Sequence, residues 1–94
     1  MTSFDHLAER YLGEPGVAEG QMFGMPVLKV GRKVFAGWSD GRLLVKLPAD
    51  RVAELIAAGE GTAFEPRPGR QSRNWVLVRD EVLAGEALGY VRGS

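Results

Sequence analysis

Residues 22–47 decide the fold, and they read MFGMPVLKVGRKVFAGWSDGRLLVKL. Two mainly apolar runs, 27–30 and 33–38, are separated by Gly31-Arg32, and a two-residue connection that starts with glycine is typical of a β-hairpin. Ser39-Asp40-Gly41 has the composition of a second turn, and a third apolar run, 42–47, follows it. The stretch therefore predicts three strands joined as an antiparallel meander.

Helical spacing flanks this stretch on both sides. Apolar residues recur at steps of three and four, which predicts helices over 3–12, 49–58 and 80–92. Ser3 and Asp80 are suited to cap the first and the last of these helices, because their side-chain oxygens can accept hydrogen bonds from free backbone N–H groups. Two shorter runs, at 62–65 and 74–78, have the composition of strands.

The predicted order of elements is α-β-β-β-α-β-β-α. Adjacent strands with helices between them indicate an α+β fold, a two-layer sandwich in which helices cover one face of an antiparallel sheet of four or five strands. With 94 residues, 45% of them apolar, we expect residues 1–94 to form a single domain. Alternation in the third strand puts its residues on two faces, Leu43, Val45 and Leu47 on one and Arg42, Leu44 and Lys46 on the other.

Several classes of protein are excluded by composition. The chain contains no cysteine, so a disulfide framework and thiolate chemistry are absent. His6 is the only histidine, which leaves no His-x-x-His spacing for a metal, and we interpret Asp5, Glu9 and Glu14 as a solvated helix face. We therefore expect no catalytic residue, no metal and no cofactor. The absence of a long apolar segment predicts no membrane span and a cytoplasmic location.

Four segments carry a family resemblance: Met22–Pro26, Lys33–Ala36, Leu44–Leu47 and Trp75–Val78. In combination they resemble the TfoX N-terminal domain family and, more distantly, the MmcQ/YjbR-like proteins. The resemblance covers nearly the whole chain and implies a fold of secretion-chaperone type. It also implies a role like that of bacterial regulators of natural competence, with no enzymatic site. The longer regulators carry an additional helical C-terminal domain that these residues do not match, so the resemblance does not by itself transfer their regulatory role to this chain.

The motif residues themselves have a structural interpretation. We expect Gly24 to adopt a backbone conformation, or a close approach, that a side chain would prevent. We expect Phe23 to pack beneath the helices.

Basic residues suggest one kind of binding surface. The loop 66–74 holds three arginines in seven residues, and guanidinium groups suit bidentate contacts with phosphate or carboxylate. A positive surface for anions or nucleic acid would combine Arg67, Arg70 and Arg73 with Lys29, Arg42 and Lys46. The alternative, which we favour, is a solvated loop whose arginines pair with Glu60, Glu65 and Asp80.

Apolar residues suggest a second kind of surface. The predicted strands carry apolar side chains on both faces, although helices would cover only one face of the sheet. Some apolar surface is therefore left uncovered, and the residues that contribute to it are Val27, Phe35, Trp38 and Leu44. A patch of this kind marks a protein partner or a homodimer interface. Because the net charge is zero and the pI is about 6.6, we rank nucleic acid below a protein partner. The sequence thus predicts a small non-enzymatic regulatory or adaptor domain acting through protein contact or self-association, with anion or nucleic-acid binding as the alternative.

Overall fold

The computed structural model describes residues 4–22, 24–39, 41–65 and 69–93, which form one antiparallel six-stranded sheet and three helices. In chain order the elements are α1 (Phe4–Tyr11), β1 (Val17–Met22), β2 (Met25–Val30), β3 (Lys33–Ser39), β4 (Arg42–Lys46), α2 (Ala49–Ala57), β5 (Gly61–Ala63), β6 (Trp75–Val78) and α3 (Val82–Arg92). The predicted α+β class and the order of the predicted elements are confirmed. Strand β1 precedes the predicted meander as an additional strand.

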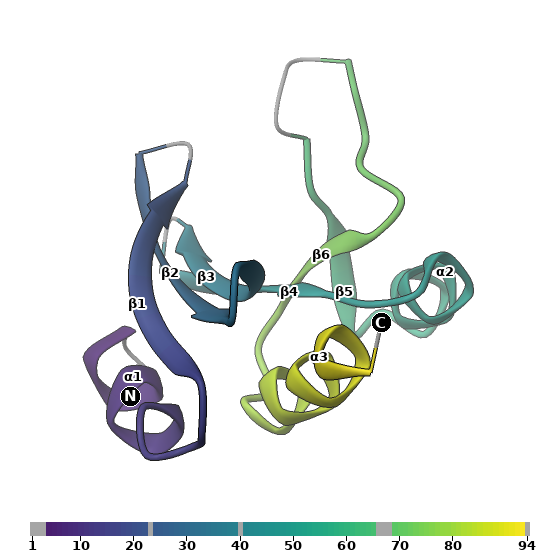
Figure 1. Ribbon diagram of the computed structural model, residues 1–94. Helices are drawn as coiled ribbons and strands as arrows, with labels where there is room; N and C mark the ends of the chain where they lie inside the picture. The colour runs from purple at the N-terminus through teal and green to yellow at the C-terminus, as the bar shows by residue number, and fades with distance from the viewer. Residues whose placement is uncertain (1–3, 23, 40, 66–68, 94) are drawn as a thin grey trace.

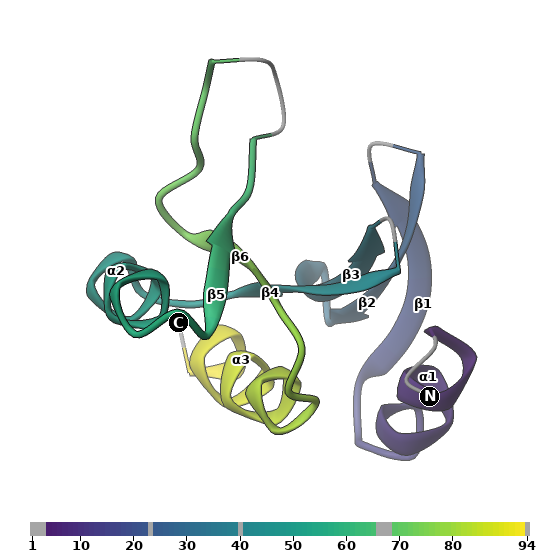
Figure 2. The same ribbon diagram turned by 180° about the vertical axis from the view of Figure 1, so that it is seen from behind.

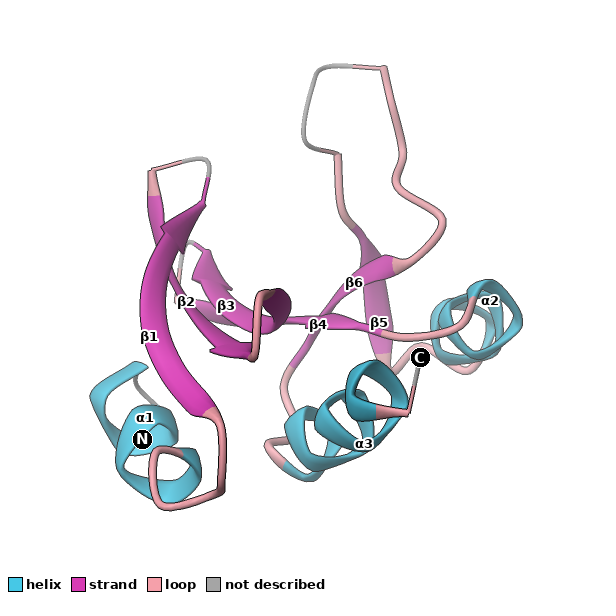
Figure 3. Ribbon diagram, in the orientation of Figure 1, coloured by secondary structure: helices cyan, strands magenta, loops and turns pink. Residues whose placement is uncertain are grey.

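The helices lie to one side of the sheet, whose strand order is β1-β2-β3-β4-β6-β5. Figure 1 shows α1 and α3 beneath the strands and α2 beside β5, and Figure 2 shows the same arrangement from behind. The β1–β2 hairpin and the β5–β6 hairpin rise on either side of β3 and β4, away from α1 and α3 (Figure 3). The sheet therefore curves so that its inner side is the side without helices.

The main hydrophobic core lies between the sheet and the helices. Leu7 of α1, Leu55 of α2 and Leu88 of α3 are all buried in it. Tyr11 packs edge-on against Phe35, with ring centroids 6.2 Å apart, and its hydroxyl donates a hydrogen bond to the Glu81 backbone carbonyl at 3.2 Å. Burial raises the pKa of Tyr11, so the phenol keeps the proton that it donates. Tyr11 thus links α1 to both the sheet and the start of α3.

A β-bulge in β3 decides which way its side chains point. The register pairs Leu28 with Ala36 but Lys29 with Val34. Phe35 is therefore an extra residue on β3, and at such a bulge two consecutive side chains face the same side of the sheet. Phe35 and Ala36 both belong to the core, and Trp38 packs against it.

Strand β1 is the element that the sequence pattern does not indicate. Alanine, glutamate and glycine are depleted in strands, and all three occur in β1. The strand is held by pairing with β2 along its whole length. Gly24 in the connecting turn has φ 74°, which confirms that it adopts a conformation that glycine favours. Phe23 lies outside the described residues, so its expected packing beneath the helices is not tested.

The three helices form close to their predicted bounds. The Asp80 carboxylate accepts a hydrogen bond from the Val82 backbone N–H at 3.0 Å, as expected of a capping residue at the start of α3. Ser3, the predicted cap of α1, lies outside the described residues.

The two edges of the sheet differ in their cover. At β5, a Cβ atom on Gly61 would lie 2.7 Å from Val76 Cγ2 and 3.2 Å from Leu55 Cβ, so the missing side chain lets α2 pack directly on this edge. At β1, no further strand pairs with the outer edge within the described part of the chain. The sheet therefore has one edge covered by a helix and one open edge.

Candidate functional site

The side of the sheet away from the helices is organised around a row of residues that crosses all six strands. Register places them side by side in the order Gly20, Val27, Gly37, Leu44, Leu77 and Thr62. We call this side the helix-free face, and it comprises this row with Lys29, Val34, Arg42, Lys46 and Trp75, which share its orientation. Val27 lies across Gly37, because a Cβ on that glycine would be 3.1 Å from Val27 Cγ1. The floor of the face is therefore apolar and closely packed.

Cations surround this apolar floor. Lys29 of β2 and Arg42 and Lys46 of β4 alternate with core residues, so all three point to the helix-free face. Arg79 directly follows β6 and lines the same cavity as Arg42. From strand spacing and rise, the Cα atoms of Lys29 and Lys46 are about 10 Å apart and those of Arg42 and Lys46 about 13 Å apart. Three of the six predicted cations are thus brought together.

Within the described part of the chain, the cations of this face are not held in ion pairs. Among the residues that the structure describes, Lys29, Arg42, Lys46 and Arg79 form no ion pair. Glu19 is the only acidic residue in the described strands, and it pairs with the core residue Leu28, so it points to the opposite side. The cations of the helix-free face therefore remain available to an anionic partner.

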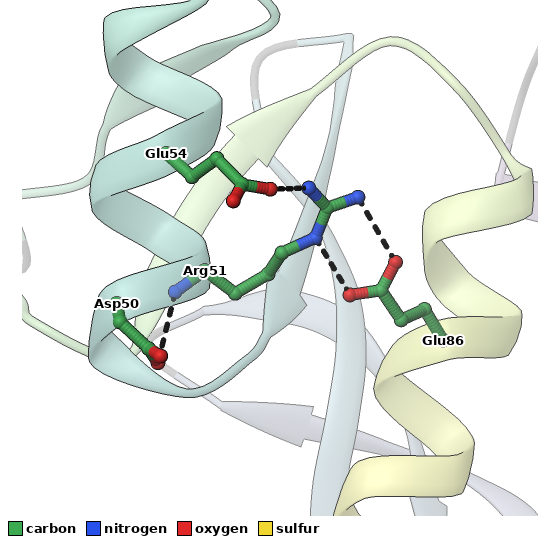
Figure 4. Close-up of polar contacts among 4 residues, drawn as sticks. All are labelled: Asp50, Arg51, Glu54 and Glu86. Atoms are coloured by element: carbon green, nitrogen blue, oxygen red, sulfur yellow. Dashed lines mark hydrogen bonds and ion pairs between the residues drawn. The ribbon is translucent and has the colours of Figure 1, made fainter.

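Arg51 shows the opposite situation on the helix side. Its Nε and Nη2 atoms donate to the Glu86 carboxylate at 2.8 and 3.1 Å, and Nη1 donates to Glu54 (Figure 4). The hydrogen bonds to Glu86, and then the single one to Glu54, raise the pKa of the Arg51 guanidinium. Arg51 thus bridges α2 and α3, and its guanidinium is occupied by these two carboxylates instead of being available to a ligand.

The structure describes residues 69–74 of the arginine loop 66–74. Arg67 lies outside the described residues, whereas Arg70 and Arg73 are exposed. The predicted pairing of these two arginines with Glu60, Glu65 and Asp80 does not occur, since no ion pair joins them. Arg73 lines a groove of about 350 Å³ beside α2. The loop therefore lies next to α2, and the structure does not join Arg73 to the cations of the helix-free face.

The four predicted partner-surface residues do not form one exposed patch, which corrects the sequence-based picture of surplus apolar surface. Phe35 is 0% exposed and Trp38 half-buried on the helix side, because the bulge in β3 turns both toward the core. Val27 and Leu44 are also 0% exposed, and they lie on the helix-free face outside the main core. Both are cross-strand neighbours of Gly37, and the Val27 side chain packs over this glycine.

Trp75 is a residue of this face that sequence reasoning did not select. It is half-buried, pairs with Lys46 across β4 and β6, and lies outside the helix-side core. The available signal was alternation in β6: Val76 and Val78 belong to the core, so Trp75 and Leu77 point away from it. The sequence alone did not reveal that β6 is the direct neighbour of β4.

A cavity of about 540 Å³ opens where β5 begins and β6 ends, at the opposite end of these strands from the loop that joins them. Its lining includes Arg42 and Arg79 but also the carboxylates Glu60, Asp80 and Glu86. Because both signs of charge line it, this cavity is not a dedicated anion site. It marks only one end of the cationic helix-free face.

The remaining candidate residues are placed as follows. His6 Nε2 lies 3.5 Å from a Glu81 carboxylate oxygen, and Asp5, Glu9 and Glu14 are exposed. Within the described ranges, no group of three histidine, aspartate or glutamate side chains could hold a metal ion. None of the described helices is both long enough and apolar enough to span a membrane.

Fold and surface together define a small α+β domain whose sheet presents one cationic face opposite its helices. The sequence profile of the TfoX N-terminal domain family matches residues 9–88 of the 94 residues. The chain belongs to this family. No match was found among curated proteins or among solved structures.

Proposed function

We propose that this chain is a small non-enzymatic regulatory domain that binds nucleic acid over the helix-free face of its sheet. The observation that carries the proposal is the grouping of Lys29, Arg42, Lys46 and Arg79 on one face without carboxylate partners among the described residues. A nucleic acid presents a row of phosphate groups that such a row of cations can bind, and each contact releases a counterion from the nucleic acid.

Zero net charge does not oppose this proposal, because what matters is where the charges lie. The six strands carry four basic residues, Lys29, Lys33, Arg42 and Lys46, against one acidic residue, whereas the three helices carry five acidic residues against three arginines. Glu54 of α2 and Glu86 of α3 neutralise Arg51. A protein with no net charge can thus present a positive sheet and a more acidic helical side. We therefore reverse the ranking made from the sequence and place nucleic acid above a protein partner.

Charge removal on the face tests the proposal. The variant Lys29→Gln/Arg42→Gln/Lys46→Gln is expected to bind a mixed-sequence DNA, offered as single strand and as duplex, much more weakly than the wild-type chain. Each lost phosphate contact lowers the slope of log affinity against log salt by about 0.7 to 0.9, so three contacts lower it by about 2 to 3. Fluorescence anisotropy at a series of salt concentrations measures both quantities.

A second variant with the same change of charge provides the control. Arg67→Gln/Arg70→Gln/Arg73→Gln removes three positive charges from the loop and is expected to retain most of the affinity and most of the salt dependence. Thermal unfolding should show both variants close to wild-type stability, because surface substitutions shift it by about 0.5 kcal/mol or less. If the loop variant loses binding and the face variant keeps it, the loop is the site. Absence of wild-type binding at low salt rejects both the helix-free face and the loop as nucleic-acid sites.

Self-association is a second candidate, and the open edge of β1 favours it. An unpaired edge strand presents free N–H and C=O groups that another strand can pair with. Ala18 and Glu19 are exposed on this edge, and the strand contains no lysine or proline of the kind that blocks edge pairing. Antiparallel pairing of β1 with β1 of a second copy would extend the sheet and join two helix-free faces.

Light scattering at increasing protein concentration tests this second candidate. The molar mass should rise toward that of a dimer, and Ala18→Lys should keep the protein monomeric, because lysine is the side chain that most often protects an edge strand from pairing. Ala53→Lys, the same substitution at an exposed position of α2, is the matched control and should still dimerise. A wild-type chain that stays monomeric at all concentrations contradicts the candidate.

A further inference from the structure

Trp75 is the one tryptophan on the helix-free face, and its position suggests the kind of nucleic acid that the face accepts. The chain has two tryptophans, and the other, Trp38, packs against the core on the helix side. Trp75 is half-buried and is the direct cross-strand neighbour of Lys46. Directly paired residues in an antiparallel sheet have Cβ atoms about 4.5–5.5 Å apart, so an aromatic surface and a cation lie side by side.

This pairing matches the two chemical parts of a nucleotide. A base can stack on the indole ring while its phosphate approaches the lysine ammonium group, and sheet proteins that bind single strands combine stacking rings with a positive surface in this way. Lys29 and Arg42 lie on the same face and would hold neighbouring phosphates. The apolar residues Val34 and Leu77 flank the site and offer no sequence-specific hydrogen bonds.

A single strand matches this arrangement better than a duplex does. In a duplex the faces of the bases are covered by their neighbours, and proteins read it by placing a helix or a two-stranded ribbon in a groove. Trp75 instead lies within a sheet, on the inner side of a curve whose hairpins rise on either side of β3 and β4 (Figure 1). Only unstacked bases expose a face that can lie flat on this ring.

We therefore infer that the helix-free face binds single-stranded nucleic acid, with a base stacked on Trp75 and phosphates held by Lys46, Lys29 and Arg42. This inference rests on the proposed function and adds the substrate class to it. Stacking of a base is tolerant of sequence, so little preference among bases is expected. DNA and RNA single strands share the chemistry that is recognised, and both belong in the test.

The first experiment uses the fluorescence of Trp75 itself. In the variant Trp38→Phe, Trp75 is the only tryptophan, and stacking of a base on it should quench its emission as the strand is added. In Trp75→Phe, only Trp38 remains, on the helix side, and its emission should hardly change. The probes are dT and rU oligonucleotides of about 15 nucleotides, within the range of roughly 4–16 that single-strand-binding folds cover, and a duplex of equal length.

The second experiment measures affinity for the same probes. Trp75→Leu keeps an apolar side chain but removes the ring, and it should weaken single-strand binding by roughly 5- to 150-fold, the effect of losing one stacked base. Trp75→Phe keeps a ring and should retain most of the affinity. Circular dichroism and thermal unfolding confirm that each variant is folded. If Trp75→Leu unfolds, the quenching of Trp75 in Trp38→Phe decides the question.

The outcomes separate this inference from the proposed function. Tight single-strand binding with quenching of Trp75, together with much weaker duplex binding, supports both the single-strand inference and the proposed function. Equal affinity for duplex and single strand, or unchanged affinity in Trp75→Leu, overturns the single-strand inference while leaving the charge-dependent binding in place. Absence of salt-dependent binding to any of the probes overturns the proposed function as well. A difference between dT and rU of more than about tenfold shows whether the face prefers the DNA or the RNA strand.

Discussion

Phe35→Ala is expected to lower the free energy of unfolding by about 3–5 kcal/mol. The Phe35 side chain is 0% exposed and lies at the β-bulge, where it meets the ring of Tyr11 edge-on with an angle of 74° between the planes. Truncation removes this contact and leaves a cavity between α1 and the sheet. Since domains of this size are stable by about 5–15 kcal/mol, the loss is a large share of the total. Urea denaturation followed by circular dichroism measures it.

Phe35→Leu is the matched control for this prediction. It keeps most of the buried volume and should cost less than about 1.5 kcal/mol, apart from the loss of the ring contact with Tyr11. If Phe35→Ala lowers stability by less than about 1 kcal/mol, the ring is not part of the core. Phe35 would then return as a candidate for a partner surface.

The part of the fold that could be predicted from the sequence is the part set by local pattern. The hairpin at Gly31-Arg32 and the three helices follow from turn chemistry and from apolar spacing, and the structure contains them. Strand β1 could not be predicted in this way, because its composition is poor for a strand and its conformation depends on pairing with β2. Elements that depend on a partner strand become visible only when the sheet is assembled.

The orientation of side chains in β3 is a second point at which the sequence was insufficient. Simple alternation puts Phe35 and Trp38 on opposite faces, which is why the strands appeared to carry surplus apolar surface. The extra residue in the bulge shifts the alternation by one, so both side chains face the helices. No residue in Lys33–Ser39 marks the bulge, because it results from the register with β2.

The candidate site was predictable where it lies within one strand. Arg42 and Lys46 alternate with Leu43 and Val45, and this pattern already indicated a basic second face. The contribution of Trp75 was not predictable, since it depends on β6 pairing with β4 after a helix, a strand and a long loop. The loop arginines were easier to notice in the sequence, but Arg73 lies beside α2.

Leu44→Ala is the prediction that best separates the two interpretations of the apolar residues on the helix-free face. Leu44 is 0% exposed, and its cross-strand neighbours are Gly37, which has no side chain, and Leu77. Val27 already packs over this glycine, so truncation of Leu44 would leave a cavity in a closely packed floor and should lower the free energy of unfolding by about 2–5 kcal/mol. Leu44→Met, which keeps the volume, should cost less than about 1.5 kcal/mol and leave nucleic-acid binding intact.

A partner-surface role for Leu44 predicts the reverse pattern. A residue that contacts a second protein can be truncated with little effect on the stability of the monomer, while the association measured by light scattering is lost. Urea denaturation and light scattering of Leu44→Ala therefore give opposite answers under the two interpretations. Because the side chain is fully buried within one copy of the chain, we expect the loss to appear in stability. The apolar floor of the helix-free face then packs beneath the cations and Trp75, and the nucleic acid binds on the solvent side of these residues.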